Sequence, residues 1–550
     1  MRRRSASASL TALCAVVVLA ACSADESSSV LDPTPSPSRS SSEKPPSPSP
    51  TKAVRAETGP PIGAGWGPSR KELARARALV STMSLSELAG QVIVARYEGT
   101  AAPAQMVNDL HLGGVIAFDE NIAGADDVRA ANERLQSSAA RAGRKWPVFI
   151  GVDQEGGIVE RVKREATRFP TFMTAGAAAE PRLTTKAAEA SGAELTDLGF
   201  TVVFAPVADV TSGTDDPTIG SRSAGSRPAH VATQMNAAVD GYLSAGILPV
   251  VKHFPGHGSV PADSHVELPV QTKSLTQLMR SDLVPFRSAV TGGVSAVMVA
   301  HIDIPAVDPG FPSTLSRKMV TGVLRDKLGF DGIAVTDALN MAGVADRFDS
   351  AQSAVRALRA GNDVLLMPPD PRAARDGIVA AVQDRRLARV RLEQAAIRQV
   401  AVLLHQRGVR PSVSRKPGTS GEIARRLSSA GVSIVSGPCS GRLVARSVRA
   451  TGAAEAVARF NAAASRAGLT TGEGSTVALV GYGGAVANAD VVVSMDTPYV
   501  LGGSGASTAK IALYGDTPSA MRALVDVLLG RASAPGRLPV KVAGVDRTGC

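Results

Sequence analysis

Aromatic residues are scarce in this sequence, at 3% of its 550 residues, whereas basic residues are in excess. There are 60 Lys and Arg residues against 49 Asp and Glu residues, which gives a formal net charge of +11. Such a charge would suit a nucleic-acid-binding protein, but the arginines are scattered through helical stretches and are not interleaved with aromatic residues. We therefore predict no nucleic-acid partner and favour a basic surface near an anionic cell wall or membrane.

Cysteine is also rare, with four residues and no Cys-x-x-Cys pair. That spacing is the usual sign of a cysteine zinc site or a redox pair, so neither is indicated. In an exported protein Cys439 and Cys550 could form a disulfide, although two free thiols fit the sequence nearly as well. Beyond residue 21 no run of about 18 apolar residues occurs, so we expect no further membrane-spanning segment.

The N-terminus has the features of an export signal. Arginines at positions 2–4 precede an apolar stretch, 10–21, that is too short to span a bilayer as a mature helix. Small residues just before Cys22 resemble a bacterial lipobox, in which the cysteine receives lipid; the alternative is an ordinary cleaved signal with an incidental cysteine. We predict a signal peptide over 1–21, lipid on Cys22 and a Ser/Pro-rich tether over 22–60, hence an exported lipoprotein anchored in the cell membrane and facing the cell wall.

Short apolar runs alternate with helical stretches through the first two thirds of the chain. The runs are 92–97, 114–118, 148–153, 201–207, 247–254, 296–302, 333–337 and 364–368. Expected helices include 125–142, 184–198, 230–245, 274–290, 316–328, 350–360 and a closing stretch over 372–407. Because buried strands alternating with helices are typical of a covered parallel sheet, eight such units predict a (β/α)8 TIM-type barrel over 68–407. An open doubly wound sheet is the alternative.

A second, smaller α/β pattern follows a loose Gly- and Pro-containing segment, 408–418. Its expected strands are 432–436, 477–482, 490–496 and 510–516, with a helix over 518–529 and a last strand near 538–542. We predict a C-terminal α/β domain of the sandwich type over 420–545.

Polar residues mark the ends of five of the eight expected barrel strands. They are Asp153, Asp209, Lys252 with His253, His301 and Asp337. In a barrel enzyme the chemistry lies where strands end and loops begin, on the C-terminal face. One charged strand end could be a satisfied core group, but five indicate a polar pocket at the mouth of the barrel.

Histidines gather in the same region, since four of the seven lie between His253 and His301. The segment 252–265, KHFPGHGSVPADSH, is rich in Gly and Pro and is therefore a loop. Its histidines with Asp263 could bind zinc, but a loop lacks the fixed face that a helical zinc motif supplies, so we predict no metal site. The alternative is acid–base chemistry, in which Asp263 orients His265 and favours its protonated form. An Asx-turn with a bystander histidine fits the same three residues.

Asp337 ends an apolar strand and needs a positive or hydrogen-bonding partner to offset its desolvation. Candidate partners are Lys252, Arg161 and Arg222. A carboxylate held ionised there is a plausible nucleophile. The alternative is that Asp337 caps the following helix.

These segments together resemble family-3 glycoside hydrolases, specifically the bacterial β-N-acetylglucosaminidase (β-N-acetylhexosaminidase) branch. The resemblance covers about 70–405 and lies in MSLSELAGQ (83–91), DQEGGIVER (153–161), FAPVADV (204–210), IGSRS (219–223), KHFPGHG (252–258), DSH (263–265), VMVAHI (297–302) and TDALNM (336–341). The C-terminal segment, 514–540, looks like the second domain of two-domain members.

The resemblance implies retaining hydrolysis of terminal β-linked N-acetylhexosamine, and the expected sugar is N-acetylglucosamine from peptidoglycan fragments. Asp337 matches the nucleophile, His265 the general acid/base on a mobile loop, and Asp263 its partner. Residues that match sugar-hydroxyl and N-acetyl ligands are Asp153, Arg161, Arg222, Lys252 and His253. No metal or organic cofactor is implied, the partners are amino-sugar glycans or muropeptides, and a monomer is favoured.

The sequence departs from the family pattern beside the site. Ile158 stands where Arg is usual, Ser259 and Val260 replace Asp-Thr, and Ala224 replaces a common Phe. These changes put the aglycone side and loop closure in doubt more than the chemistry. The alternatives are a β-glucosidase or β-xylosidase of the same family, a non-catalytic lipoprotein that binds wall sugars, and a zinc hydrolase.

Overall fold

The computed structural model describes residues 65–163 and 166–550. The predicted signal peptide over 1–21, the lipid on Cys22 and the tether over 22–60 therefore lie outside the described residues. None of the helices in the described part of the chain has the length and apolarity that a membrane crossing requires.

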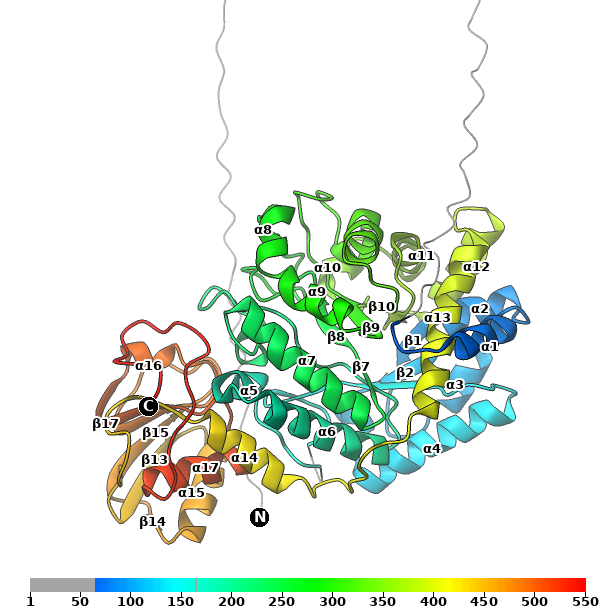
Figure 1. The fold of residues 1–550 in the computed structure, drawn as a ribbon. Coiled ribbons are helices and arrows are strands. Elements are labelled where there is room, and N and C mark those ends of the chain that lie inside the picture. The colour runs from blue at the N-terminus through cyan, green and yellow to red at the C-terminus, as the bar shows by residue number, and fades with distance from the viewer. Residues whose placement is uncertain (1–64, 164–165) are drawn as a thin grey trace, which may run out of the picture. The chain divides into compact units, whose positions relative to one another are not determined.

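The predicted barrel is confirmed, since every expected apolar run contributes to its parallel strands and the run 247–254 contributes two. Figure 1 labels several of these strands among the surrounding helices. In chain order the strands are β1 (Ile93–Arg96), β2 (Gly114–Ala117), β3 (Phe149–Val152), β6 (Val202–Val203), β7 (Leu248–Pro249) continuing into β8 (Val251–Phe254), β9 (Ala296–Val299), β10 (Ile333–Thr336) and β11 (Leu365–Leu366). The ladder runs β11-β1-β2-β3-β6-β7 and β8-β9-β10. Parallel bridges Val207–Lys252 and Val335–Val364 join the two parts into a closed ring, which excludes the open-sheet alternative.

Helices cover the outside of the strands because each has one apolar stripe that packs on the sheet. They are α1 (Arg70–Val80), α2 (Leu85–Gln91), α3 (Ala104–Asp109), α4 (Ala125–Arg141), α6 (Pro181–Asp197), α7 (Pro228–Ser244), α8 (Leu275–Arg280), α9 (Leu283–Thr291), η4 (Lys318–Lys327), α11 (Ser350–Ala360), α12 (Pro371–Gln383) and α13 (Arg389–Gly408), with the short α10 (Ala342–Ala345) after β10. The helix expected over 274–290 is two helices, because the backbone leaves helical geometry at Ser281. The segment 318–327 is a π-helix and not the α-helix expected over 316–328.

The bottom of the barrel holds a buried ionic cluster. The Asp363 carboxylate pairs with Arg325 at 2.5 Å, Arg391 at 2.9 Å and Arg398 at 3.5 Å. It also accepts a hydrogen bond from the Ala334 amide, at 3.0 Å, which ties it to β10. Burial opposes ionisation of Asp363, but the arginines outweigh it and hold its pKa below the usual range. At this end of a barrel such a cluster serves stability rather than catalysis.

The second α/β sheet is also confirmed. Its strands are β12 (Ser433–Ser436), β13 (Ser447–Gly452), β14 (Thr470–Thr471), β15 (Ser475–Val480), β16 (Asn488–Ser494) and β17 (Gly505–Ala512), in the order β12-β17-β16-β15-β13-β14, with only β12 antiparallel to its neighbour. One apolar cluster joins this sheet to α15 (Ala454–Arg466) and α17 (Pro518–Leu528), while α14 (Gly421–Gly431) packs on α17. On the other face, α5 of the barrel (Phe172–Ala178) and α16 (Val500–Gly503) contribute to a second cluster.

The last strand predicted near 538–542 is wrong. Leu538 and Val540 are buried against the sheet, as their alternation suggests, but they form no ladder with it. The chain instead makes single bridges at Pro535 and Arg537. The predicted domain limits, 68–407 and 420–545, stay predictions.

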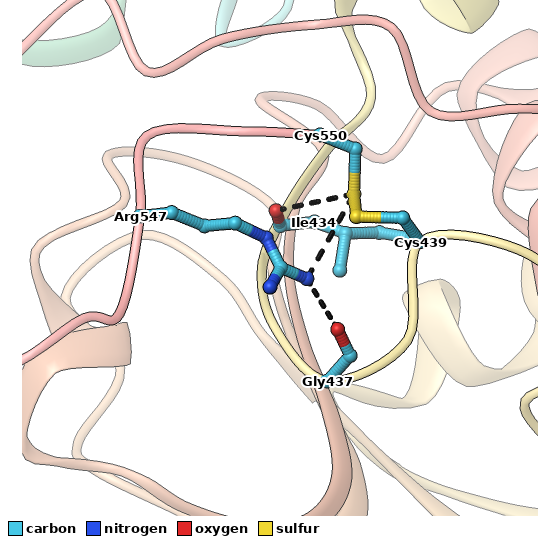
Figure 2. The surroundings of a disulfide bond; sticks show 5 residues. All are labelled: Ile434, Gly437, Cys439, Arg547 and Cys550. Atoms are coloured by element: carbon cyan, nitrogen blue, oxygen red, sulfur yellow. Dashed lines mark hydrogen bonds between the residues drawn. A yellow bond between two sulfur atoms is a disulfide. The ribbon is translucent and has the colours of Figure 1, made fainter.

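Cys439 and Cys550 form a disulfide, which resolves the choice left open by the sequence (Figure 2). Their Cα atoms are 5.7 Å apart and the bond closes a loop of 111 residues. Arg547 lies beside the bond and donates a hydrogen bond to the carbonyl of Gly437. The disulfide thus ties the C-terminus to the segment after β12.

Candidate active site

A pocket of about 420 Å³ opens at the C-terminal ends of the barrel strands. Of the eight residues predicted for catalysis or sugar binding, all but Asp263 line it. The seven are Asp153, Arg161, Arg222, Lys252, His253, His265 and Asp337. They come from the ends of β3, β8 and β10 and from the loops that follow β3, β6 and β8, so the barrel gathers residues that lie far apart in the sequence.

Two carboxylates and two cations form the floor of the pocket. Nζ of Lys252 lies 2.6 Å from Oδ1 of Asp153 and 2.7 Å from Oε1 of Glu155. Arg222 donates two hydrogen bonds to Glu155, at 2.9 and 2.8 Å, in the bidentate geometry that a guanidinium favours. Burial opposes ionisation of Glu155, but Arg222 and Lys252 outweigh it and hold the pKa of Glu155 well below its usual range. Burial likewise opposes the charge of Lys252, yet the two carboxylates raise its pKa.

Asp209 is fully buried, and it orients the ring of His253 and holds the backbone of His257. Its Oδ2 is 2.6 Å from Nδ1 of His253, and its Oδ1 accepts the backbone N–H of His257 at 2.7 Å. Since the carboxylate only accepts, Nδ1 of His253 carries a proton and the ring presents Nε2 toward Arg222, 3.3 Å away. Asp209 therefore fixes the tautomer of a ring that faces the pocket.

Asp337 directly follows β10, and its Oδ1 accepts the backbone N–H of Ala338 at 2.8 Å. Burial opposes its ionisation, but the rings of His301 and His253 and this N–H outweigh burial and hold the pKa of Asp337 below its usual value. Among the candidate partners predicted for Asp337, Lys252 and Arg222 contact Asp153 and Glu155, while Arg161 contacts Asp119, and their effect on Asp337 stays a prediction.

His301 supports Asp337 from behind the pocket. Its ring is fully buried, with Nδ1 2.6 Å from Oγ1 of Thr314 and Nε2 3.0 Å from the carbonyl of Ala338. Since that carbonyl only accepts, Nε2 donates to it and fixes the backbone beside Asp337. The capping alternative for Asp337 is excluded, because the next helix, α10, begins only at Ala342 and its N-cap position is Met341.

Asp263 and His265 meet on an exposed loop. Oδ1 of Asp263 is 2.7 Å from Nδ1 of His265 and also accepts the backbone N–H of His265 at 2.9 Å. The predicted pair and the alternative Asx-turn are therefore both present. Burial opposes ionisation of Asp263, but the hydrogen bonds from His265 outweigh it and lower the pKa of Asp263. Between them, Oγ of Ser264 forms a hydrogen bond of 2.9 Å with Nε2 of the buried His257. This bond attaches the loop to the barrel.

Arg161 reaches the pocket from the edge. Its guanidinium lies 5.1 Å from the ring centroid of Phe118 and 3.5 Å from Oδ1 of Asp119. Both neighbours belong to the segment after β2, so this arginine links two loops at the rim.

Sequence reasoning missed Glu155 as a site residue, although it lies within the quoted segment 153–161. It also gave no role to His257 or Ser264, which line the pocket. Among residues 65–163 and 166–550, no group of three or more His, Cys, Asp and Glu residues is arranged to hold a metal ion. The departure at Ile158 leaves an apolar side chain 47% exposed at the tip of the hairpin formed by β4 (Gln154–Gly156) and β5 (Val159–Glu160).

Curated relatives of this chain are bacterial β-hexosaminidases. β-Hexosaminidase A of Pseudoalteromonas piscicida is 36% identical over 55% of this chain, which spans half the length of that relative. β-Hexosaminidase LpqI of Mycobacterium tuberculosis is 33% identical over 54% of this chain and 77% of the relative. These names support a glycosidase.

Solved structures give the same family over a longer stretch. A glycoside hydrolase family 3 β-N-acetylglucosaminidase from Paenibacillus sp. str. FPU-7 superposes with a TM-score of 0.76 at 28% identity, covering 84% of this chain and 99% of that one. The model of the glycosyl hydrolase family 3 N-terminal domain matches residues 84–402. Fold, pocket and relatives agree, and the chain belongs to family 3 of the glycosyl hydrolases.

Proposed function

We propose that this protein hydrolyses terminal, non-reducing β-linked N-acetylhexosamine with retention of configuration, acting on N-acetylglucosamine of peptidoglycan fragments. One observation carries the proposal: Asp337 and His265 line the same pocket. Asp337 lies at the end of a barrel strand, whereas His265, paired with Asp263, lies on an exposed loop. Relatives named as β-hexosaminidases support the sugar class.

In the first step a carboxylate oxygen of Asp337 attacks the anomeric carbon. The bond from that carbon to the leaving oxygen breaks, and His265 transfers its proton to the oxygen. In the second step His265 takes a proton from water, the water oxygen bonds to the anomeric carbon, and Asp337 leaves as a carboxylate. The lowered pKa of Asp337 suits this role, because the nucleophile must be ionised when substrate binds.

An imidazole replaces the second carboxylic acid that most retaining glycosidases use at a fixed separation of about 5–5.5 Å. The negative charge of Asp263 compensates, since it stabilises the imidazolium that donates the proton. The side chain of His265 is 65% exposed and lines the pocket, so a bound sugar and water can both reach it for proton transfer.

The floor of the pocket is suited to sugar hydroxyls and an N-acetyl group. Asp153 accepts hydrogen bonds, whereas Lys252, Arg222 and Arg161 donate them, and charged partners make such bonds stronger than neutral ones. His253 offers Nε2 beside Arg222. These five residues are the proposed sugar ligands, and Glu155 holds two of them in place.

The test is hydrolysis of an aryl β-N-acetylglucosaminide by the full chain. We expect Asp337→Ala to lose at least about 10³-fold in kcat, whereas the matched exposed variant Asp346→Ala keeps wild-type activity. The first product anomer, followed by NMR, is β for a retaining enzyme. A fluorinated N-acetylglucosaminyl substrate should label Asp337, located by mass spectrometry. Faster turnover of the aryl glucoside or xyloside, or a label on another residue, contradicts the proposal.

The cellular setting is a separate part of the proposal. Lipid on Cys22 would hold the enzyme at the outer side of the membrane. There the enzyme would act as a monomer, with muropeptides and other amino-sugar glycans as its partners. The support is the residue pattern before Cys22. We expect Cys22→Ala to move the protein from the membrane to the soluble fraction, and equal membrane retention of both forms contradicts lipidation.

A further inference from the structure

The loop between β6 and α7 brings Arg222 to the pocket and also contacts the C-terminal α/β domain. Ser221 and Arg222 are neighbours in a 3₁₀ turn, Gly220–Arg222, where successive side chains point about 120° apart. Arg222 therefore turns toward Glu155, while Ser221 turns away from the pocket. Oγ of Ser221 donates a hydrogen bond to the carboxylate of Asp496, two residues beyond the end of β16.

Both partners of this bond are shielded from water. Ser221 is 1% exposed and Asp496 is 8% exposed. A hydrogen bond to a carboxylate in such surroundings is stronger than one between neutral groups, and leaving either partner unpaired costs its full desolvation. The contact is thus a specific buried attachment and not a surface contact.

The rest of the loop has little freedom to compensate. Asp216 accepts the amides of Thr218, Ile219 and Gly220, at 3.2, 2.8 and 3.1 Å, which makes the turn one compact unit. At its far end the N–H of Ser226 donates to the carbonyl of Pro539, at 3.2 Å, again in the C-terminal segment. A shift at Ser221 is therefore transmitted to Arg222.

We propose that Asp496 of the C-terminal domain is a positioning residue for sugar binding, acting through Ser221 on Arg222. The guanidinium must keep its two bonds to Glu155 while it presents its free edge to the sugar. The inference rests on the proposed function, in which Arg222 is a sugar ligand. It assigns the C-terminal domain a part in the active site without any of its side chains touching the substrate.

The kinetic test compares Asp496→Ala with wild type on an aryl β-N-acetylglucosaminide. We expect KM to rise about tenfold with kcat changed less than about threefold, because a misplaced binding group weakens substrate and transition state alike. Ser221→Ala should give the same rise, and the double variant should be no worse than either single one, since both remove one interaction. Asp496→Asn keeps an acceptor oxygen and should restore most of the affinity.

The matched control is Asp490→Ala. Asp490 lies in the same strand, β16, and accepts hydrogen bonds from Thr476 and Ser507 without contacting the barrel loop. We expect this variant to change thermal stability but not KM. A KM rise equal to that of Asp496→Ala, unchanged KM in both Asp496→Ala and Ser221→Ala, or no rescue by Asp496→Asn would overturn the inference.

Hydrogen exchange separates this inference from the proposed function. In the full chain without substrate, Asp496→Ala should speed amide exchange over 218–223, whereas Asp490→Ala should not. A wild-type protein that fails to hydrolyse the substrate refutes the proposed function and leaves this measurement valid. Identical exchange over 218–223 in wild type and Asp496→Ala refutes the positioning role, whatever the activity.

Discussion

Replacing Glu155 by Gln disturbs the charge balance on which the pocket is built. The two cations Lys252 and Arg222 face the two carboxylates Glu155 and Asp153, with contact distances of 2.6–2.9 Å. The side chains of Lys252 and Glu155 are each 3% exposed, so water does little to screen them. The Glu155→Gln variant leaves one carboxylate to balance two buried cations.

The expected loss is about 3–5 kcal/mol of unfolding free energy, as is typical when one member of a buried pair is removed. Coulomb's law at an effective dielectric of about 20 gives about 6 kcal/mol for each lost attraction at ~2.8 Å. Two favourable changes offset much of the lost attraction to Lys252 and Arg222. The variant no longer has to strip water from a buried carboxylate at position 155, and it no longer has the repulsion between Glu155 and Asp153. KM should also rise, because Arg222 and Lys252 lose the negative charge that orients them and Arg222 loses one of its two acceptor oxygens.

Urea unfolding followed by circular dichroism measures the first effect. The matched control is Glu422→Gln, since Arg425 makes the same two bonds to Glu422, at 2.9 and 2.8 Å, on the surface. Exposed pairs contribute little, so this variant should lose at most about 0.5 kcal/mol. Equal losses in the two variants, with KM unchanged in Glu155→Gln, would refute the reasoning.

Four further expectations follow from the same contacts. Asp363→Asn leaves three buried arginines around a neutral amide and should lower the unfolding free energy by about 3–5 kcal/mol in urea titrations, while kcat/KM of the folded enzyme stays unchanged. Cys439→Ser opens a loop of 111 residues and should cost up to about 4 kcal/mol, seen as a lower melting temperature that reductant also produces in wild type. Burial lowers the pKa of His257 to about 4, whereas an unfolded histidine titrates near 6.5. Between pH 6.5 and 4 the unfolded chain therefore binds more protons than the folded chain, and the wild type loses stability as pH falls. The variant His257→Gln lacks this histidine, so the excess unfolding free energy of wild type over the variant should shrink by up to about 3 kcal/mol from about pH 6.5 to about pH 4. A pH-independent difference between the two proteins contradicts this. Asp263→Asn keeps an acceptor for both bonds from His265 but loses the charge, so its kcat should lie between wild type and Asp263→Ala, which should fall about 10²-fold at constant KM.

The barrel was predictable because its strands are buried almost throughout and read as apolar runs, with Arg96 of β1 as an exposed exception. Strand β13 was missed for the opposite reason, since most of its residues are exposed or half-buried. Near 538–542 the pattern did report burial correctly, at Leu538 and Val540. Burial of alternate side chains does not specify a strand ladder, however. Over 538–542 the backbone makes single hydrogen bonds, such as Leu538 N–H to the carbonyl of Thr548 and Ser226 N–H to the carbonyl of Pro539, and no ladder.

The position of the pocket followed from the strand ends, because the carboxyl ends of parallel strands meet at one face. The partners within it did not follow. Three cations were available to Asp337 by chemistry alone, yet Lys252 and Arg222 bind Glu155 more directly. Which of several equivalent charges meet is set by loop geometry. The contact of Ser221 with Asp496, across 275 residues, likewise depends on the tertiary structure.

Glu155 is nevertheless the one site residue that the sequence could have yielded. It lies two positions after Asp153, at the start of a hairpin, and residues two apart in an extended chain face the same side. Both carboxylates do reach the same ammonium group, Nζ of Lys252. When one buried cation already pairs with a carboxylate, burying a second carboxylate beside it costs more free energy than burying the first. A second cation is needed to offset that cost. In the structure Arg222 is that cation, since it donates two hydrogen bonds to Glu155 from another loop.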